Sequence, residues 1–206
     1  MSEQAVVSDK LVVQLDSAEG CLGWASLGGR RWRCTVGAGG IREDKVEGDA
    51  ATPAGTWPLR RLYFRNDRLV LPKVRLPARP IAEHDGWCDD PRSPSYNRLV
   101  RIPNEWSHEK MWREDGLYDL VVVVGYNDDP PEGEWGSAIF LHIARDDYGP
   151  TQGCVAFARD DLLDLVGRIG PRTRLQVLSV PASETAPKPA VDEDMKQFED
   201  FDEQDW

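Results

Sequence analysis

The sequence predicts a mainly β domain with one or two short helices, followed by an acidic tail. Short runs rich in β-branched and aromatic residues recur between turn-forming residues, and only two stretches carry helix signals. Charge is uneven as well, because 181–206 holds nine acids against two lysines and so carries −7 of the net charge of −11. We therefore expect a short N-terminal end at 1–9, one domain at 10–180, and an acidic, disordered tail at 181–206.

The N-terminal half reads as a series of strands. Glycine-containing turns separate three short runs, which favours an antiparallel meander. These runs are 10–16, 21–27 and 31–36. The glycine-rich and charged stretch 37–55 is expected to be a loop, with further strands at 57–64 and 69–71. Three prolines then indicate an irregular connection through Ile81.

The C-terminal half carries the stronger signals. After an expected turn-rich loop at 84–97, a capping serine predicts a short helix at 107–114. Four consecutive valines within 116–126 are typical of a strand that is buried on both faces. Apolar residues at helical spacing before a Gly-Pro pair predict a helix at 159–169. The other expected strands are 137–144 and 173–180.

Composition excludes several classes of function. The domain has a net charge of only −4, which argues against nucleic-acid binding, since that requires clustered Lys and Arg. Four widely spaced cysteines are too few for a disulfide scaffold and are expected to be reduced. Neither a signal-peptide pattern nor a membrane-spanning apolar run is visible, so a cytoplasmic location is expected, with periplasmic action left open.

One cluster has the residue types of a metal site. His84, Cys88, Asp89 and Asp90 lie close together, but structural zinc sites normally show paired ligands twice over. We expect an ordered loop here, and no metal.

A histidine and a cysteine near the C-terminal end suggest nucleophilic catalysis. Cys154 follows His142 by twelve residues, and the intervening Asp, Gly and Pro residues can turn the chain so that the two side chains meet. His142 would take the thiol proton, and the helix beginning shortly after Cys154 would direct its positive end toward the sulfur. Gly153 would leave room for a substrate carbonyl and offer its N–H to an oxyanion. The alternative is a buried structural cysteine beside a core histidine.

The segment HIARDDYGPTQGCVAF, from His142, resembles the signature of the L,D-transpeptidase (YkuD-type) catalytic domain. In that family a His precedes a Ser/Thr-x-Gly-Cys box, here Thr151 to Cys154. A second stretch, from Lys45 through Glu47-Gly48-Asp49 to Thr52-Pro53-Ala54-Gly55, resembles the family's upstream motif. The resemblance covers roughly 10–180 and implies a YkuD-like β-sandwich or mixed-sheet fold.

The resemblance also implies a reaction. Cys154 would attack the L-to-D peptide bond of a peptidoglycan stem tetrapeptide, before its terminal D-Ala, and form a thioester. His142 would act as base and then as acid for the leaving amine. The thioester would be resolved by the amine of a second stem peptide or by water. The partner is thus a bacterial stem peptide or muropeptide, no cofactor is implied, and the oligomeric state stays open.

Two positions depart from the family pattern. Ala156 stands where members usually carry Arg or Asn, and Gln152 stands where many have His. We expect Arg145 to hold the substrate carboxylate instead, because a guanidinium matches a carboxylate. Together with Arg145, Thr151 and Gln152 are the expected substrate contacts.

Three functions remain to be distinguished. The expected location favours hydrolysis, that is, L,D-carboxypeptidase action in peptidoglycan recycling, over cross-linking. A catalytically inactive binding module with the same fold is the alternative, and Ala156 is the residue that favours it. A metal-dependent hydrolase ranks third.

Overall fold

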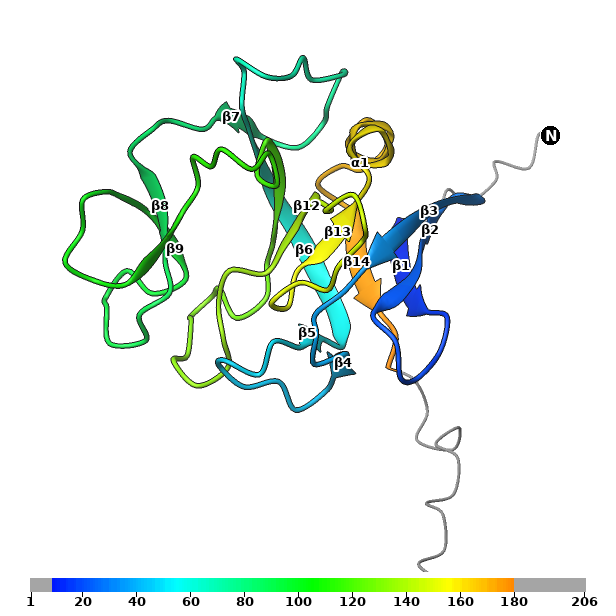
Figure 1. Cartoon of the computed structure of the whole chain (residues 1–206), viewed down its shortest axis with the longest axis horizontal. Helices are drawn as coiled ribbons and strands as arrows, with labels where there is room; N and C mark the ends of the chain where they lie inside the picture. Colours follow the sequence, from blue (N-terminus) through cyan, green and yellow to red (C-terminus); the bar gives the residue numbers. More distant parts are fainter. Residues whose placement is uncertain (1–8, 180–206) are drawn as a thin grey trace, which may run out of the picture.

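The computed structural model describes residues 9–179, whose strands form a closed barrel with a small sheet beside it (Figure 1). Nine strands belong to one sheet, and an additional pairing between its first strand and β6 closes eight of them into a ring. In sheet order the ring strands are β11 (Leu120–Val124), β12 (Phe140–Ile143), β13 (Val155–Phe157), β3 (Arg30–Thr35), β2 (Leu22–Leu27), β1 (Lys10–Leu15), β14 (Arg174–Val177) and β6 (Gly55–Phe64).

The remaining elements lie around the ring. β7 (Ala78–Pro80) pairs with β6 outside the barrel. The small sheet has the order β10 (His108–Lys110), β8 (Asp85–Cys88), β9 (Arg98–Arg101). A two-stranded pair joins β4 (Ile41–Arg42) and β5 (Thr52–Pro53), and the single helix of the described residues is α1 (Arg159–Val166).

Alternation along β11 shows how the core is divided. Leu120, Val122 and Val124 belong to the cluster inside the barrel, whereas Val121 and Val123 belong to a second cluster on its outer face. All five residues are buried, which confirms the strand predicted to be covered on both faces. The outer cluster fills the space between the barrel and the small sheet.

The expected meander and C-terminal helix are confirmed. β1, β2 and β3 pair as antiparallel neighbours. α1 buries Leu162, Leu165 and Val166, and its Asp164 accepts a hydrogen bond from the Trp32 indole N–H at 3.0 Å. This bond and the apolar face fix the helix against the barrel.

The expected sandwich is wrong, because the sheet closes. β6 is ten residues long, so its first part pairs with β14 while its second part pairs with β11. A bulge between Val122 and Val124 adds twist at this junction. The mixed sheet is confirmed, since parallel and antiparallel pairs both occur.

The expected helix at 107–114 is wrong, and the expected loop at 84–97 is wrong in part. The segment 108–110 is strand β10, which pairs with β8, and β8 begins inside the expected loop. Only Met111 of this segment is fully buried, so the sequence offers no apolar stripe that a helix could bury. Pairing with β8 satisfies its backbone instead.

Three smaller differences concern short elements. Residues 69–71 do not form a strand, although Leu69 packs into the barrel core. The loop at 37–55 contains β4 and β5, and β13 follows Cys154 directly. The expected tail at 181–206 lies outside the described residues. Within 9–179, no helix has the length and apolar character needed to cross a membrane.

Candidate active site

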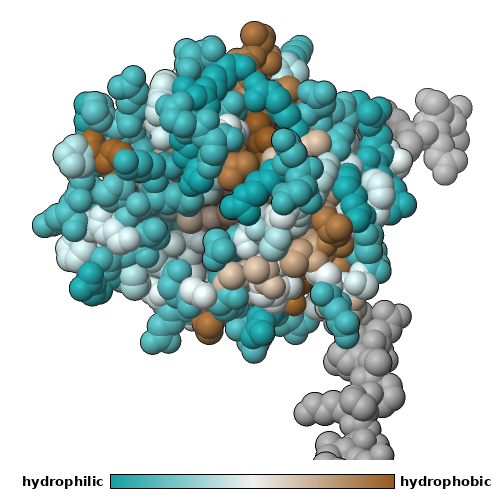
Figure 2. Space-filling model, in the orientation of Figure 1, coloured by the Kyte–Doolittle hydropathy of each residue, from teal (hydrophilic) through white to brown (hydrophobic). Residues whose placement is uncertain are grey.

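A cavity of about 430 Å³ opens between the barrel and the lobe that carries the small sheet. Figure 2 shows that the surrounding face is mostly hydrophilic and is hollowed between these two parts. The cavity brings together every side chain that the sequence singled out for the site. These are His142, Arg145, Thr151, Gln152 and Cys154.

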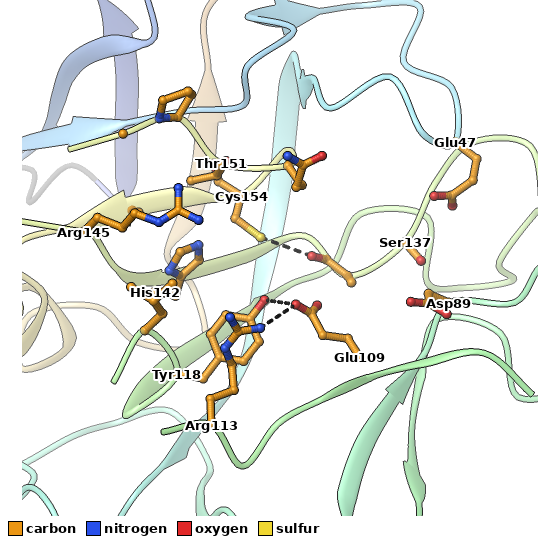
Figure 3. A pocket seen from close by; sticks show the side chains of 16 residues that line it. Glu47, Asp89, Glu109, Arg113, Tyr118, Ser137, His142, Arg145, Thr151 and Cys154 are labelled. Carbon is orange, nitrogen blue, oxygen red and sulfur yellow. Dashed lines mark hydrogen bonds and ion pairs between the residues drawn. The ribbon is translucent and has the colours of Figure 1, made fainter. Parts of the chain in front are cut away.

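The strand register explains why Cys154 and His142 meet. β12 and β13 are parallel neighbours, with His142 opposite Ala156. Because side chains alternate along a strand, Cys154 lies on the same face as Ala156, diagonally across from His142. Figure 3 shows the imidazole and the thiol on the same wall of the cavity. Neighbouring parallel strands, rather than the connecting turn alone, bring the two groups together.

His142 is held in one tautomer by a backbone contact. Its Nδ1 lies 2.8 Å from the carbonyl oxygen of Ile143, and a carbonyl only accepts, so Nδ1 carries the proton. Nε2 is therefore left with a lone pair for a substrate or thiol proton. Burial lowers the pKa of His142 to about 4, against the opposing effect of this hydrogen bond. At neutral pH the imidazole is a neutral base.

Cys154 rests as a neutral thiol. Its Sγ donates to the Ala138 carbonyl at 3.2 Å and accepts from the Phe140 N–H at 3.4 Å. Burial raises the pKa of the thiol to about 12, with a further contribution from the charge of Glu109. A thiolate at this position would therefore have to form during an attack by the sulfur and not before it.

Two threonine hydroxyls clamp the turn before the thiol. Thr151 Oγ1 accepts from the Gly153 N–H at 3.1 Å and donates to the Cys154 carbonyl at 2.7 Å. Thr52 Oγ1 donates to the Gly153 carbonyl and accepts from the Gly37 N–H, both at 2.9 Å. Thr52 belongs to the upstream motif, so the two motifs meet at this turn.

Glycine is required at position 153. Its φ is +128°, and a Cβ there would lie 2.8 Å from the Ala51 carbonyl oxygen. Its N–H is bonded to Thr151, so an oxyanion would have to replace the hydroxyl as acceptor. Gly153 is also absent from the lining of the cavity.

Lys45 and Asp49 of the upstream motif have a structural role. Lys45 Nζ and Asp49 Oδ1 form an ion pair of 2.8 Å whose side chains are 5% and 9% exposed. Asp49 also accepts from the N–H groups of Val46 and Ala51. These bonds shape the loop that places Thr52 against the nucleophile turn.

The expected effect of the helix on the thiol is wrong. Strand β13 separates Cys154 from α1, which begins only at Arg159. A strand of three residues spans about 10 Å, so the positive end of the helix lies beyond the thiol, at the far end of β13. A helix dipole acts mainly within its first turn.

The small side chain of Ala156 leaves open space in the cavity wall, and Arg145 lines the same cavity. Ala156 faces the cavity opposite His142, and its small side chain opens the wall at that point. Arg145 follows β12 by two residues, is exposed, and has no ion pair within 9–179. Figure 3 shows its guanidinium beside His142 and Thr151.

Sequence reasoning missed the acidic wall of the cavity. Glu47, Asp89 and Glu109 line it, and Figure 3 shows Glu47 and Asp89 on the side away from Arg145. Glu109 accepts the Tyr118 hydroxyl at 2.8 Å and lies 3.5 Å from Arg113. Burial, together with Asp89, raises the pKa of the Glu109 carboxyl. Glu47 was noted only as part of the upstream motif and Asp89 only as a possible metal ligand, and Glu109 carried no signal.

Metal-ligand geometry is not found in the described part of the chain, where no group of three or more His, Cys, Asp or Glu could hold an ion. In the cluster considered from the sequence, Cys88 is buried in β8 and Asp90 pairs with Arg92 at 2.7 Å.

Comparison with protein families agrees with this geometry. A family model described as the L,D-transpeptidase catalytic domain, YkuD, matches residues 15–177. The chain belongs to this family. The matched residues contain seven of the eight ring strands, the cavity, and both motifs that meet at the turn before Cys154, and they begin at the last residue of β1, Leu15. No curated protein and no solved structure matches the chain.

Proposed function

We propose that this domain transfers the acyl group of a peptidoglycan stem tetrapeptide, with Cys154 as nucleophile. The observation that carries the proposal is the placement of Cys154 and His142 on one face of adjacent parallel strands, at the wall of a single cavity. Family membership supplies the class of substrate, since L,D-transpeptidases act on peptidoglycan peptides. Acyl transfer to a cysteine requires a nucleophile and a base whose side chains lie close together.

In the first step, Sγ of Cys154 attacks the carbonyl carbon before the terminal D-Ala while Nε2 of His142 takes the thiol proton. The oxyanion is bound by the backbone N–H groups of the 153–154 turn. For this, the Gly153 N–H gives up its hydrogen bond to Thr151 Oγ1 and donates to the oxyanion instead. The carbon–nitrogen bond then breaks, and the imidazolium returns the proton to the departing amine. A thioester on Cys154 and free D-Ala result.

In the second step, an amine or water attacks the thioester, and Sγ leaves with the proton that His142 removed from the attacking group. An amine acceptor gives a new peptide bond, and water gives the shortened tripeptide. His142 is neutral at rest, because burial lowers its pKa to about 4, so Nε2 has a free lone pair to accept a proton in each step.

The two walls of the cavity support a substrate that carries both charges. Arg145, which has no ion pair in 9–179, would hold a carboxylate of the stem peptide. Glu47, Asp89 and Glu109 face the same space and would attract an ammonium group. Thr151 supports the turn, and exposed Gln152 lies where substrate would pass.

The test is incubation with a disaccharide tetrapeptide, with and without a D-amino acid as acceptor, followed by mass spectrometry of the products. Release of D-Ala alone indicates hydrolysis, while incorporation of the acceptor or dimer formation indicates transpeptidation. Products that form equally with the Cys154→Ala variant would contradict the proposal. No product with the wild-type chain under either condition would favour the inactive binding module.

A further inference from the structure

A second pocket lies at the β9 edge of the small sheet and is lined by residues of β9, β6 and β11. Its volume is about 380 Å³. We refer to it as the arginine pocket, after the residues that characterise it. These are Arg60, Arg61, Tyr63, Trp87, Arg98 and Val123. None of them takes part in the proposed reaction.

The arginines of this pocket are gathered by the β6–β11 bulge. Register partners are Leu62 with Val122 and Leu59 with Val124, so Arg60 and Arg61 together oppose the single residue Val123. A bulge of this kind turns two consecutive side chains toward one side of the sheet. Arg98, from the facing hairpin strand β9, lines the same pocket.

Only one of the three guanidiniums is neutralised. Arg60 makes a bidentate pair with Asp128, at 2.7 and 2.9 Å. Arg61 and Arg98 are exposed and have no ion pair among the described residues. Two largely buried aromatic residues line the same pocket, since Tyr63 is 2% and Trp87 is 7% exposed. The pocket therefore combines two guanidiniums that lack an ion pair in 9–179 with aromatic residues in its lining, which suits a ligand that is both acidic and aromatic.

The chain itself contains such a ligand beyond the described residues. The segment 197–206, QFEDFDEQDW, carries five acids, three aromatic residues and no base. We propose that this segment docks in the arginine pocket of its own chain, with its carboxylates at Arg61 and Arg98. Its aromatic rings would cover Tyr63 and Trp87. This proposal does not depend on the proposed catalytic function.

The connecting chain is long enough for this contact. Val177 of β14 pairs with Gly55, and Arg61 lies six residues farther along β6, or about 20 Å at the rise of a strand. Seventeen residues lie between Ser179 and Gln197, and the chain joining these two positions spans up to about 60 Å when extended. Tethering also raises the local concentration of the segment near the pocket.

Docking there would cover one end of a row of packed rings. Trp87 lies 5.0 Å from Phe140, Phe140 lies 5.9 Å from Tyr118, and Tyr118 lies 5.3 Å from His142, each pair edge to face. The arginine pocket is thus at the outer end of the row whose inner end is the catalytic base.

Zero-length cross-linking tests the contact in the full chain. An Arg61→Lys/Arg98→Lys variant keeps the positive charge and supplies amines that a carbodiimide joins to carboxylates. The matched control is Arg31→Lys, because Arg31 is also exposed, also without an ion pair in 9–179, and also beside an aromatic ring, Trp24, at 4.5 Å. Peptide mapping identifies the joined residues, and the Cys154→Ala background keeps the result independent of catalysis.

We expect cross-links from positions 61 and 98 to residues 199–205 to be about tenfold more abundant than from position 31. Replacing Phe198, Phe201 and Trp206 together by Ser should reduce the yield of these cross-links severalfold, and 1 M salt should reduce it by roughly the same factor. Equal yields from positions 61, 98 and 31 would overturn the proposal. Cross-links that join ¹⁴N-labelled to ¹⁵N-labelled chains in a mixture would overturn it as well, because the occupant would then be a second copy.

Discussion

Cys34 and Cys154 are buried thiols that lie on opposite faces of the barrel sheet. Both thiols are buried, and burial raises the pKa of each to about 12. Cys34 points into the barrel core from β3, whereas Cys154 belongs to the outer cluster and lines the cavity with His142. A shifted thiol pKa therefore does not identify the nucleophile. The face of the sheet distinguishes the two thiols, because Cys154 shares a cavity with His142 and Cys34 does not.

The largest expected effect separates these two thiols directly. Cys154→Ala should reduce D-Ala release by about a thousandfold or more, since no other group in the cavity can form the thioester. Cys34→Ala should retain activity and lose about 1 kcal/mol of unfolding free energy through a small cavity. Rates on the tetrapeptide and denaturant titrations measure the two quantities. Equal loss of activity in both variants would remove the distinction between the faces.

His142→Gln should lower kcat by about 10²–10⁴-fold, because glutamine cannot take the thiol proton. The matched control is His108→Gln. Nδ1 of His108 also contacts a backbone carbonyl, that of Trp106 at 2.7 Å, but His108 does not line the cavity. The control should keep nearly full activity. Similar losses for both histidines would indicate a structural effect rather than loss of the base.

The same histidine should make stability depend on pH. Its pKa of about 4 in the folded protein lies below the ordinary value of 6.5, so the unfolded chain binds the proton more tightly. Stability from this group is thus complete above pH 6.5 and is lost as the pH falls toward 4, by about 3 kcal/mol in total. Urea titrations across this range should show a steeper decline for the wild type than for His142→Gln. Parallel curves would contradict the buried neutral imidazole.

Two buried threonines extend the comparison to hydroxyl groups. Thr52 Oγ1 bonds the nucleophile turn and Gly37, whereas Thr35 Oγ1 has no partner within 9–179. Thr52→Val should therefore cost about 1–3 kcal/mol of unfolding free energy, and Thr35→Val should be close to neutral or stabilising. Thermal unfolding of the two variants measures this difference. If the two substitutions cost the same, the bonds of Thr52 do not stabilise the turn.

Arg145 carries the smallest expected effect. Arg145→Ala should raise KM for the tetrapeptide about tenfold with little change in kcat, because a charged hydrogen bond to the substrate carboxylate is lost. The KM of Arg145→Lys should lie between those of the wild type and Arg145→Ala, since lysine keeps the charge but lacks the planar guanidinium. Steady-state kinetics give both constants. An unchanged KM would leave the carboxylate to another group.

The site was predictable from sequence where its geometry is local. His142, the turn and Cys154 lie within one strand–turn–strand segment, so residue types and spacing were sufficient to pair them. Alternation along 137–144 also placed Ile139, Leu141 and Ile143 on one face and Phe140 and His142 on the other, as the two core clusters and the cavity lining confirm.

Features that depend on distant pairing were not predictable. Barrel closure needs β6 and β11 to meet across more than fifty residues, and no local pattern in the sequence specifies that pairing. The small sheet consists of strands of three or four residues rich in charge, which read as loop or helix, so Glu109 could not be placed in the cavity. The helix beginning at Arg159 was predicted, but the short strand β13, which lies between Cys154 and this helix, was not.

The central claim is that Cys154, on the outer face of the barrel, becomes acylated and Cys34 does not. Its most direct test is the intact mass of the protein quenched with acid during turnover of the tetrapeptide, followed by peptide mapping of the adduct. We predict a single thioester-linked tripeptide on the Cys154 peptide, absent from Cys154→Ala and present in Cys34→Ala. An adduct on Cys34, or D-Ala release with no adduct on Cys154 at any time, would contradict the account.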